Sequence, residues 1–82
     1  MLYNVVGIKR DMSFPGNDGK MVEGLKLYVS CPDDKVDGLM TDSFFISASA
    51  PVFGKVNGLK PDMYIDIYFN RYGKIDSVAV AQ

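Results

Sequence analysis

The last third of the chain carries the pattern that most restricts its fold. Apolar and polar side chains alternate between residues 63 and 70: Met63, Ile65, Ile67 and Phe69 against Tyr64, Asp66, Tyr68 and Asn70. This period of two predicts a β-strand with one buried and one solvent-facing side. The segment 70–73 then predicts a turn, because asparagine and glycine suit the backbone angles of tight turns. We therefore expect a β-hairpin at the end of the chain, with Arg71 and Tyr72 exposed at its tip.

Two strands are expected in the first part of the chain. The first covers residues 2–10, with Val6 and Ile8 on one side and Val5 on the other, and an exposed loop of turn-forming residues follows at 11–19. The second runs from Lys20 to about residue 31. Its buried face is expected to carry Leu25, Leu27, Val29 and Cys31, and its outer face Lys26, Tyr28 and Ser30. Gly24 interrupts the alternation and indicates a bulge or a sharp bend.

The middle of the chain is expected to contain one strand and one short helical turn. A polar connection at 32–41 leads into a third strand at 42–49. Residues 50–62 combine helical spacing of apolar residues with Gly54, Gly58 and Pro61, which predicts a single turn of α-helix or 3₁₀-helix. In the last strand, a bulge near Asp76 would let Ile75, Val78 and Val80 all point inward.

These five strands predict one all-β domain over residues 1–82, a small closed antiparallel barrel of the OB-fold type. An SH3-like barrel is the alternative, and it differs mainly in where the helical connection falls. Closure is expected because an open antiparallel sheet leaves two unpaired edges. The predicted core contains Leu25, Leu27, Val29, Ile46, Ile65, Ile67 and Val80.

The composition argues against an enzyme. The chain has no histidine and a single cysteine, Cys31, so it lacks the residues for a disulfide, a thiolate–imidazole metal site or a Cys/His or Ser/His catalytic pair. Cys31 lies in a hydrophobic alternation and is expected to be buried. The acidic group Asp33, Asp34 and Asp37 lacks the spacing of a calcium-binding loop. We therefore expect a non-catalytic protein with no cofactor, no metal and no small-molecule substrate.

The chain is also expected to be soluble and cytoplasmic, with no membrane partner. No apolar run approaches the roughly 18 residues of a membrane span, and the first residues lack the features of a signal peptide. A single cysteine fits a reducing compartment. The net charge of −1 argues against a surface that attracts nucleic acid as a whole. Any such surface must come from local grouping of charges.

Aromatic and basic residues are grouped in three places. Proteins that bind single-stranded nucleic acid combine aromatic rings, on which bases stack, with cations along the backbone. The three groups are Lys26 with Tyr28, Phe14 with Lys9, Arg10 and Lys20, and Tyr68 with Arg71, Tyr72 and Lys74. They predict binding of single-stranded DNA, with RNA as a possible substitute. The competing interpretations are cross-strand packing of Tyr28 and Tyr68, and folding of Phe14 onto the core.

With this layout, the chain resembles the gene V protein family of filamentous phages and related single-stranded DNA-binding proteins of phages and mobile elements. The shared features are the size, Gly19-Lys20 before the second strand, Leu27-Tyr28-Val29 within it, and an aromatic-glycine hairpin tip before a hydrophobic strand. The resemblance implies a homodimer that coats DNA during replication. It assigns Phe14 and Lys20 to a DNA-binding wing, Tyr28 to a base-stacking surface, and Tyr72 to a hairpin tip that meets the partner subunit.

The remaining large apolar residues bear on oligomerisation. Phe44, Phe45, Phe53 and Met63 are expected in the core or in a subunit interface, and a homodimer is expected because a small barrel leaves some apolar surface uncovered. The rival function is a small protein-interaction or structural barrel whose exposed tyrosines contact a polypeptide. The net charge favours this rival, whereas the grouping of cations with aromatic residues favours DNA.

Overall fold

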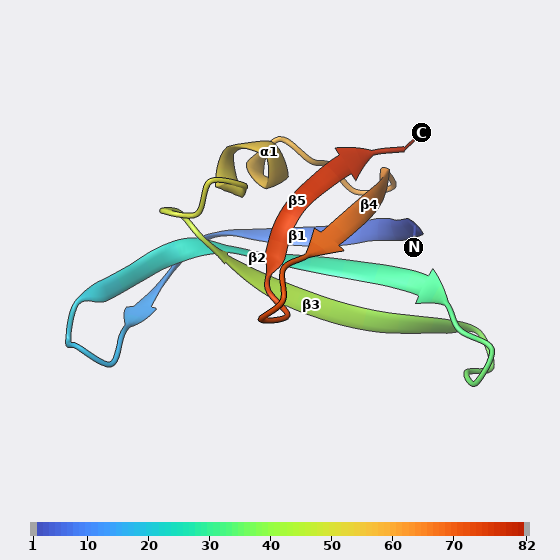
Figure 1. Cartoon of the computed structure of the whole chain (residues 1–82), viewed down its shortest axis with the longest axis horizontal. Coiled ribbons are helices and arrows are strands. Elements are labelled where there is room, and N and C mark those ends of the chain that lie inside the picture. Colours follow the sequence, from blue (N-terminus) through green and yellow to red (C-terminus); the bar gives the residue numbers. More distant parts are fainter. Residues whose placement is uncertain (1, 82) are drawn as a thin grey trace.

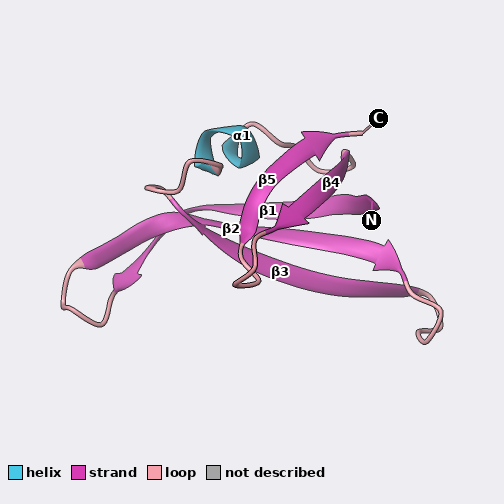
Figure 2. Ribbon diagram, viewed as in Figure 1, coloured by secondary structure: helices cyan, strands magenta, loops and turns pink. Residues whose placement is uncertain are grey.

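The predicted strands are present and form one antiparallel sheet. The computed structural model describes residues 2–81. Its strands are β1 (Leu2–Pro15), β2 (Met21–Pro32), β3 (Leu39–Ser47), β4 (Tyr64–Phe69) and β5 (Ile75–Val80), and the short helix α1 (Phe53–Asn57) connects β3 to β4 (Figures 1 and 2). The strand order in the sheet is β3-β2-β1-β4-β5. The fold is therefore mostly β, with the expected helical turn in the expected connection.

Hydrogen bonds do not close the sheet, which corrects the prediction of a closed barrel. The two edge strands are β3 and β5. β1 pairs with β4 over residues 2–4, whereas it pairs with β2 along most of its length. The β4–β5 hairpin therefore turns away from β1 and crosses the inner side of the long strands (Figure 1). Phe44 of β3 reaches Phe69 of β4 there, with 5.6 Å between ring centroids. Away from the short β1–β4 pairing, side-chain packing joins the two layers.

The hydrophobic core lies between these layers, and α1 covers part of it with Val56. Six of the residues predicted to be buried are so: Leu25, Leu27, Val29, Ile46, Ile65 and Ile67. The prediction for Val80 is wrong, because its side chain is 46% exposed. Val80 is the last residue of β5, an edge strand, so no further strand covers that side of it.

A bulge near the start of β1 changes which residues face the core. Val5 pairs with Val29 and Gly7 pairs with Tyr28, so Val6 is an extra residue without a partner in β2. Val5 is fully buried and Val6 is 55% exposed. The prediction that Val6 and Ile8 share a side is therefore wrong: the extra residue places Ile8 on the same side as Val5, where it packs against the core.

β1 is also longer than predicted, which removes most of the expected loop at 11–19. Residues 12–15 pair with residues 24–21 of β2, and Asp11, with φ of 59°, lies in a second bulge. The turn itself is confined to residues 16–20 and is closed by a hydrogen bond from the Gly16 N–H to the Lys20 carbonyl oxygen (2.8 Å). β1 and β2 therefore form a two-stranded arm that extends beyond the core (Figure 1).

One predicted irregularity is confirmed, and the one expected at Gly24 of β2 falls instead in the neighbouring strand β1. The bulge in β5 falls at Asp76, since Tyr68 pairs with Ser77 and Phe69 pairs with Ile75. Gly24 pairs with Met12 beside the second bulge of β1, and β2 itself pairs with β3 without interruption there. Gly24 has no room for a side chain. A Cβ atom at Gly24 would meet the carbonyl oxygen of Ile46 and lie 2.7 Å from the Phe45 ring.

β3 runs from 39 to 47, three residues earlier at its start than the predicted strand at 42–49.

Candidate nucleic-acid interface

The candidate site lies on the outer face of β1, β2 and β3, the face turned away from the core. Cross-strand pairing places Lys9 of β1 opposite Lys26 of β2, and Lys26 opposite Phe45 of β3. Side chains that are directly opposite in a sheet share a face and lie close together. The neighbouring row contains Gly7, Tyr28 and Ser43. Two rows of this face therefore combine two cations with two aromatic rings.

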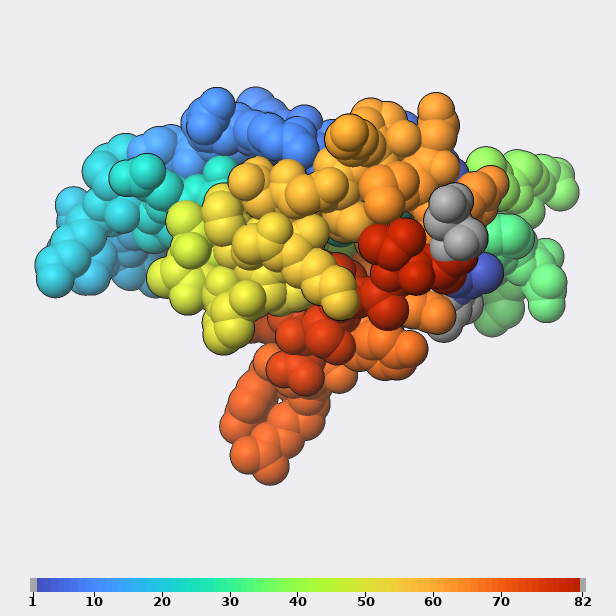
Figure 3. All heavy atoms as spheres, turned by 90° about the horizontal axis from the view of Figure 1, so that it is seen from above, coloured from blue at the N-terminus to red at the C-terminus, as the bar shows by residue number. Residues whose placement is uncertain are grey.

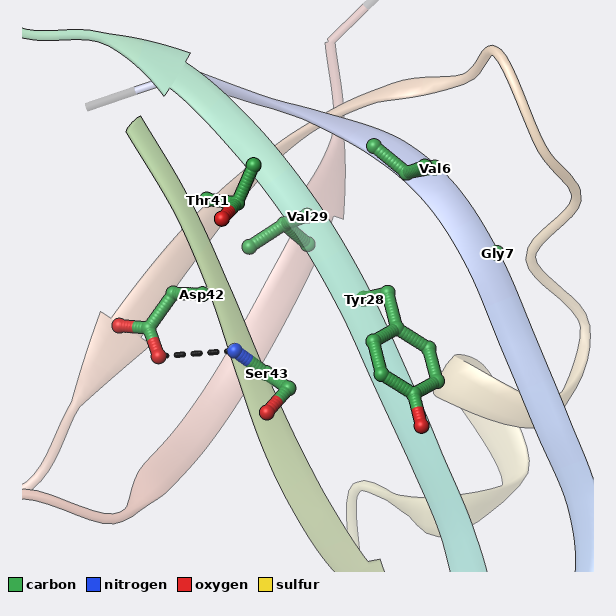
Figure 4. A pocket seen from close by; sticks show the side chains of 7 residues that line it. All are labelled: Val6, Gly7, Tyr28, Val29, Thr41, Asp42 and Ser43. Carbon is green, nitrogen blue, oxygen red and sulfur yellow. Dashed lines mark hydrogen bonds between the residues drawn. The ribbon is translucent and has the colours of Figure 1, made fainter. Parts of the chain in front are cut away.

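Tyr28 lies beside an open hollow. Its ring is 38% exposed, and the Lys26 ammonium nitrogen lies 5.9 Å from the ring centroid, within the range of a cation–π contact. The hollow has a volume of 550 Å³ and is lined by Val6, Gly7, Tyr28, Val29, Thr41, Asp42 and Ser43. Figure 4 shows the Tyr28 ring on β2 between Gly7 of β1 and Ser43 of β3. Because glycine has no side chain, the β1 side of the ring stays open to a planar ligand.

Phe14 and Phe45 form a second aromatic surface on this face. Their ring centroids are 5.1 Å apart with an interplanar angle of 65°, and the two side chains are 41% and 37% exposed. The Phe45 ring lies over Gly24, where a side chain would displace it. Phe14 was expected in a loop, and it lies instead on the arm formed by β1 and β2. We call Lys9, Phe14, Lys26, Tyr28 and Phe45 the aromatic–cation platform.

The sequence analysis missed Phe45 as a candidate binding residue. It assigned Phe45 to the core or a subunit interface together with Phe44, Phe53 and Met63, and these three do pack against the core. Phe44-Phe45-Ile46 is a run of three apolar residues, which hides the alternation of the strand. The outward position of Phe45 can still be predicted from the sequence, because Ser43 and Ser47 lie two residues before and after it and occupy the same side of β3.

Arg10 is engaged elsewhere. Its Nη2 atom donates hydrogen bonds to the carbonyl oxygens of Asn57 (2.9 Å) and Leu59 (3.1 Å) at the end of α1. A cation at a helix C-terminus is favourable because the last carbonyl groups lack partners within the helix. Arg10 thus ties β1 to α1 and points away from the platform.

The tip of the last hairpin is a rigid turn that carries a second cation–aromatic pair. The Asn70 side-chain oxygen accepts hydrogen bonds from the N–H groups of Tyr72 (2.9 Å) and Lys74 (3.1 Å), and Gly73 has φ of 77°. The Arg71 guanidinium lies 5.2 Å from the centroid of the Tyr72 ring, which is 73% exposed. Figure 3 shows this hairpin projecting from the body of the molecule.

Three further predicted site residues lie away from the platform. Lys20 is exposed in the turn at the end of the β1–β2 arm. Tyr68 is 54% exposed and alternates with Phe69, which packs toward the core side of the hairpin, so Tyr68 faces the opposite side. Lys74 is exposed at the hairpin tip. The structure therefore groups Lys9, Phe14, Lys26 and Tyr28, and places Tyr68, Arg71, Tyr72 and Lys74 on a separate projection.

A groove connects the platform to the hairpin tip. It lies between β3 and the start of β5, has a volume of 540 Å³, and is lined by residues 43–47, Ala50, Val52 and residues 73–75. Ser43 lines both this groove and the hollow beside Tyr28. An extended ligand on Tyr28 can therefore continue over the free edge of β3 toward Lys74.

One acidic side chain, Asp42, lies near this path. The Asp42 carboxylate accepts a hydrogen bond from the Ser43 N–H (2.7 Å) at the free edge of β3 (Figure 4). It brings a negative charge to the margin of the hollow.

Behind the sheet, burial raises the pKa of the Tyr3 phenol, and Cys31 and Asp42 raise it further. Cys31 is buried, as predicted, with 2% of its surface exposed.

Residues 2–81 contain no group of three or more side chains suited to hold a metal ion. No helix in this range has the length and apolar character needed to cross a membrane. Comparison of the chain with protein-family models, with characterised proteins and with solved structures finds no significant match.

Proposed function

We propose that the protein is a non-catalytic single-stranded DNA-binding protein with an OB-type fold. The strand order β3-β2-β1-β4-β5, with a helix between β3 and β4, supports this fold. OB folds are partly open five-stranded barrels that bind oligonucleotides with the face of strands 2 and 3 and with the loops that follow strands 1 and 4. The aromatic–cation platform occupies the corresponding face, and Arg71 and Tyr72 occupy the loop after β4.

The observation that carries the proposal is the grouping of Lys26, Tyr28 and Phe45 on one outer face: Lys26 pairs with Phe45, and Tyr28 lies in the adjacent row. An exposed ring on a rigid strand offers a stacking surface to an unpaired base, and such a contact contributes about 1–3 kcal/mol per base. Lys9 and Lys26 stand in the same row, and we assign them to phosphate contacts. Stacking on open rings selects single strands, since the faces of bases in a duplex are already covered.

The overall charge of −1 restricts how the protein binds. Long-range attraction of a polyanion is weak for such a chain, so binding depends on the local cations and on stacking. We expect moderate affinity, with little sequence preference and a clear salt dependence. This dependence on a few local contacts distinguishes the protein we propose from a strongly basic protein that binds any nucleic acid.

The test is a titration of a short fluorescent oligo-dT with the wild-type protein and two tyrosine variants, at several salt concentrations. Tyr28→Ala should weaken binding by about 1–3 kcal/mol, because one stacking surface is lost. Tyr64→Ala is the matched control: Tyr64 is also an exposed tyrosine, at 51%, but it lies outside the platform. Its removal should leave the affinity for a short oligonucleotide unchanged.

Two results would contradict the proposal. If the wild-type protein fails to bind at low salt while its circular dichroism shows a folded β protein, DNA is not its ligand, and the protein-interaction module is the remaining function. If both tyrosine variants lose the same affinity, the contact is not specific to the platform. A parallel titration with oligo-U distinguishes DNA from RNA as the preferred strand.

A further inference from the structure

The hollow beside Tyr28 is lined in part by side chains that carry methyl and hydroxyl groups. Val6 of β1 and Thr41 of β3 lie on either side of β2, and Ser43 lies level with the Tyr28 ring further along (Figure 4). Among the described residues, no lysine or arginine lines the hollow. A phosphate bound inside it would lose hydration without meeting a cation, so the hollow suits an uncharged group. In a single strand of DNA, that group is a base.

The first bulge of β1 places an apolar side chain at this hollow. Val6 is the extra residue between the pairs Val5–Val29 and Gly7–Tyr28, and its side chain is 55% exposed. Bulges next to binding sites often re-aim a side chain in this way. Gly7 follows with no side chain, which leaves the space between the Val6 methyl groups and the Tyr28 ring open. The bulge therefore gives the hollow an apolar wall that the core does not use.

The one carboxylate of the lining is turned away from the Tyr28 ring. Asp42 pairs with Val29, whose side chain is buried, so the Asp42 side chain leaves the strand on its inner side. Figure 4 shows it directed away from Tyr28, where it accepts the hydrogen bond from the Ser43 N–H. Asp42 thus borders the hollow at its margin, and its charge is not among the groups that a base would meet inside.

These groups favour one base over the others. In DNA recognition, arginine and lysine pair with guanine, asparagine and glutamine with adenine, and carboxylates with the cytosine amino group, whereas apolar groups contact the 5-methyl group of thymine. The lining has no basic or amide side chain among the described residues. We propose, on the basis of the proposed function, that the hollow is a thymine subsite in which Val6 and Thr41 contact the 5-methyl group of a base stacked on Tyr28.

This contact gives the protein a preference for DNA over RNA, because uracil lacks the methyl group. Burying one methyl group raises the affinity by about fourfold. A preference of this size at one position is small, so strands of other sequence are still bound.

The test is a titration of two fluorescent oligonucleotides of equal length, oligo-dT and oligo-dU, whose bases differ only in the 5-methyl group. The wild type should bind oligo-dT about fourfold more tightly. Val6→Ala should lower this ratio below about twofold, because most of the apolar contact is lost. Val80→Ala is the matched control, since Val80 is also an exposed valine of a strand, at 46%, and lies outside the hollow. It should leave the ratio unchanged.

Gly7→Val tests the space in the hollow. A Cβ atom at Gly7 meets nothing within 4 Å, and the backbone there does not have positive φ, so we expect the variant to fold. Circular dichroism checks this. Its side chain would stand beside the Tyr28 ring, and both oligonucleotides should bind at least about fivefold more weakly because a stacking contact is lost. Unchanged binding by the folded variant would overturn the proposal.

The ratio of the two affinities separates this proposal from the proposed function. Equal binding of oligo-dT and oligo-dU by the wild type would overturn the thymine subsite. A ratio that Val6→Ala leaves unchanged, or that Val80→Ala also abolishes, would do the same. In each of these cases oligo-dT is still bound, so the proposed function stands. If neither oligonucleotide is bound at low salt, the proposed function itself fails, and the subsite fails with it.

Discussion

The two ends of the outer face are built by the same strands, yet they offer different chemistry. At one end, β2 presents Lys26 and Tyr28, and its neighbours add Lys9 and Phe45. At the other end, β2 places the buried Ser30 and the exposed Pro32 on this face, and their neighbours are Asn4, Thr41 and Leu39. The alternation of each strand decides which side chains are outside. The pairing register decides which of them meet, and hence whether a row can bind an anionic strand or an apolar surface.

The largest expected effect separates the two faces of β2. Leu27 and Tyr28 are adjacent in sequence, but Leu27 is fully buried and Tyr28 is 38% exposed. Leu27→Ala should lower the free energy of unfolding by about 2–5 kcal/mol, because it leaves a cavity in the core. Tyr28→Ala should lower it by less than about 1 kcal/mol, the usual size of a cross-strand contact. Chemical denaturation of both variants measures this, and equal losses would show that Tyr28 serves packing.

The next effect concerns the support of the platform. Gly24→Ala introduces a Cβ atom against the Ile46 carbonyl oxygen and the Phe45 ring. We expect a loss of about 1–3 kcal/mol in stability from this overpacking, together with a displaced Phe45 ring. Gly7→Ala is the control, because a Cβ atom there meets nothing within 4 Å. Denaturation curves that rank the two variants in the opposite order would contradict the described packing of β2 against β3.

A smaller effect distinguishes the cations. Lys26→Ala should flatten the slope of log affinity against log salt by about 0.7, the value for one phosphate contact with a single strand. Arg10→Ala should leave that slope unchanged and should instead reduce stability, because its guanidinium bonds to the end of α1. Oligo-dT titrations over a salt series, with denaturation of the same variants, test both statements. A flatter slope for Arg10→Ala would place Arg10 on the DNA path.

The smallest effect involves the acidic margin of the hollow. Asp42→Asn keeps an oxygen that can accept the hydrogen bond from the Ser43 N–H, and it removes a negative charge beside the path of the phosphates. Oligo-dT affinity should rise by less than about 1 kcal/mol, because the carboxylate is exposed and screened by solvent. The gain should shrink as salt is added. A decrease in affinity would show that the carboxylate contacts the ligand directly.

The sequence was sufficient for the parts of the fold that depend on local alternation. The buried positions of β2 (Leu25, Leu27 and Val29) and of β4 (Ile65 and Ile67) follow from a period of two. It was not sufficient for features set by pairing between distant segments. The bulge at Val6 exists because β1 pairs with β2 in a particular register, and the partners of Arg10 lie 47 and 49 residues along the chain.

The candidate site was predictable to a similar degree. Tyr28 and Lys26 were identified because they alternate with buried residues of β2. Phe45 was missed because it lies between two apolar residues, and its contact with Phe14 joins segments far apart in the sequence. Neither the separation of Tyr68 from the platform nor the free edge of β3 follows from the sequence, since both depend on how the last hairpin turns away from β1.

The central claim is that a single strand of DNA lies on the platform end of the outer face and not on its opposite end, around Leu2, Leu39 and Tyr64. Backbone amide chemical-shift mapping by NMR, during a titration with short oligo-dT, tests it most directly. The largest shifts should fall on Lys9, Lys26, Tyr28, Ser43 and Phe45. Leu2, Leu39 and Tyr64 should barely change. Shifts that concentrate on these three residues, or an unchanged spectrum at low salt, would contradict the account.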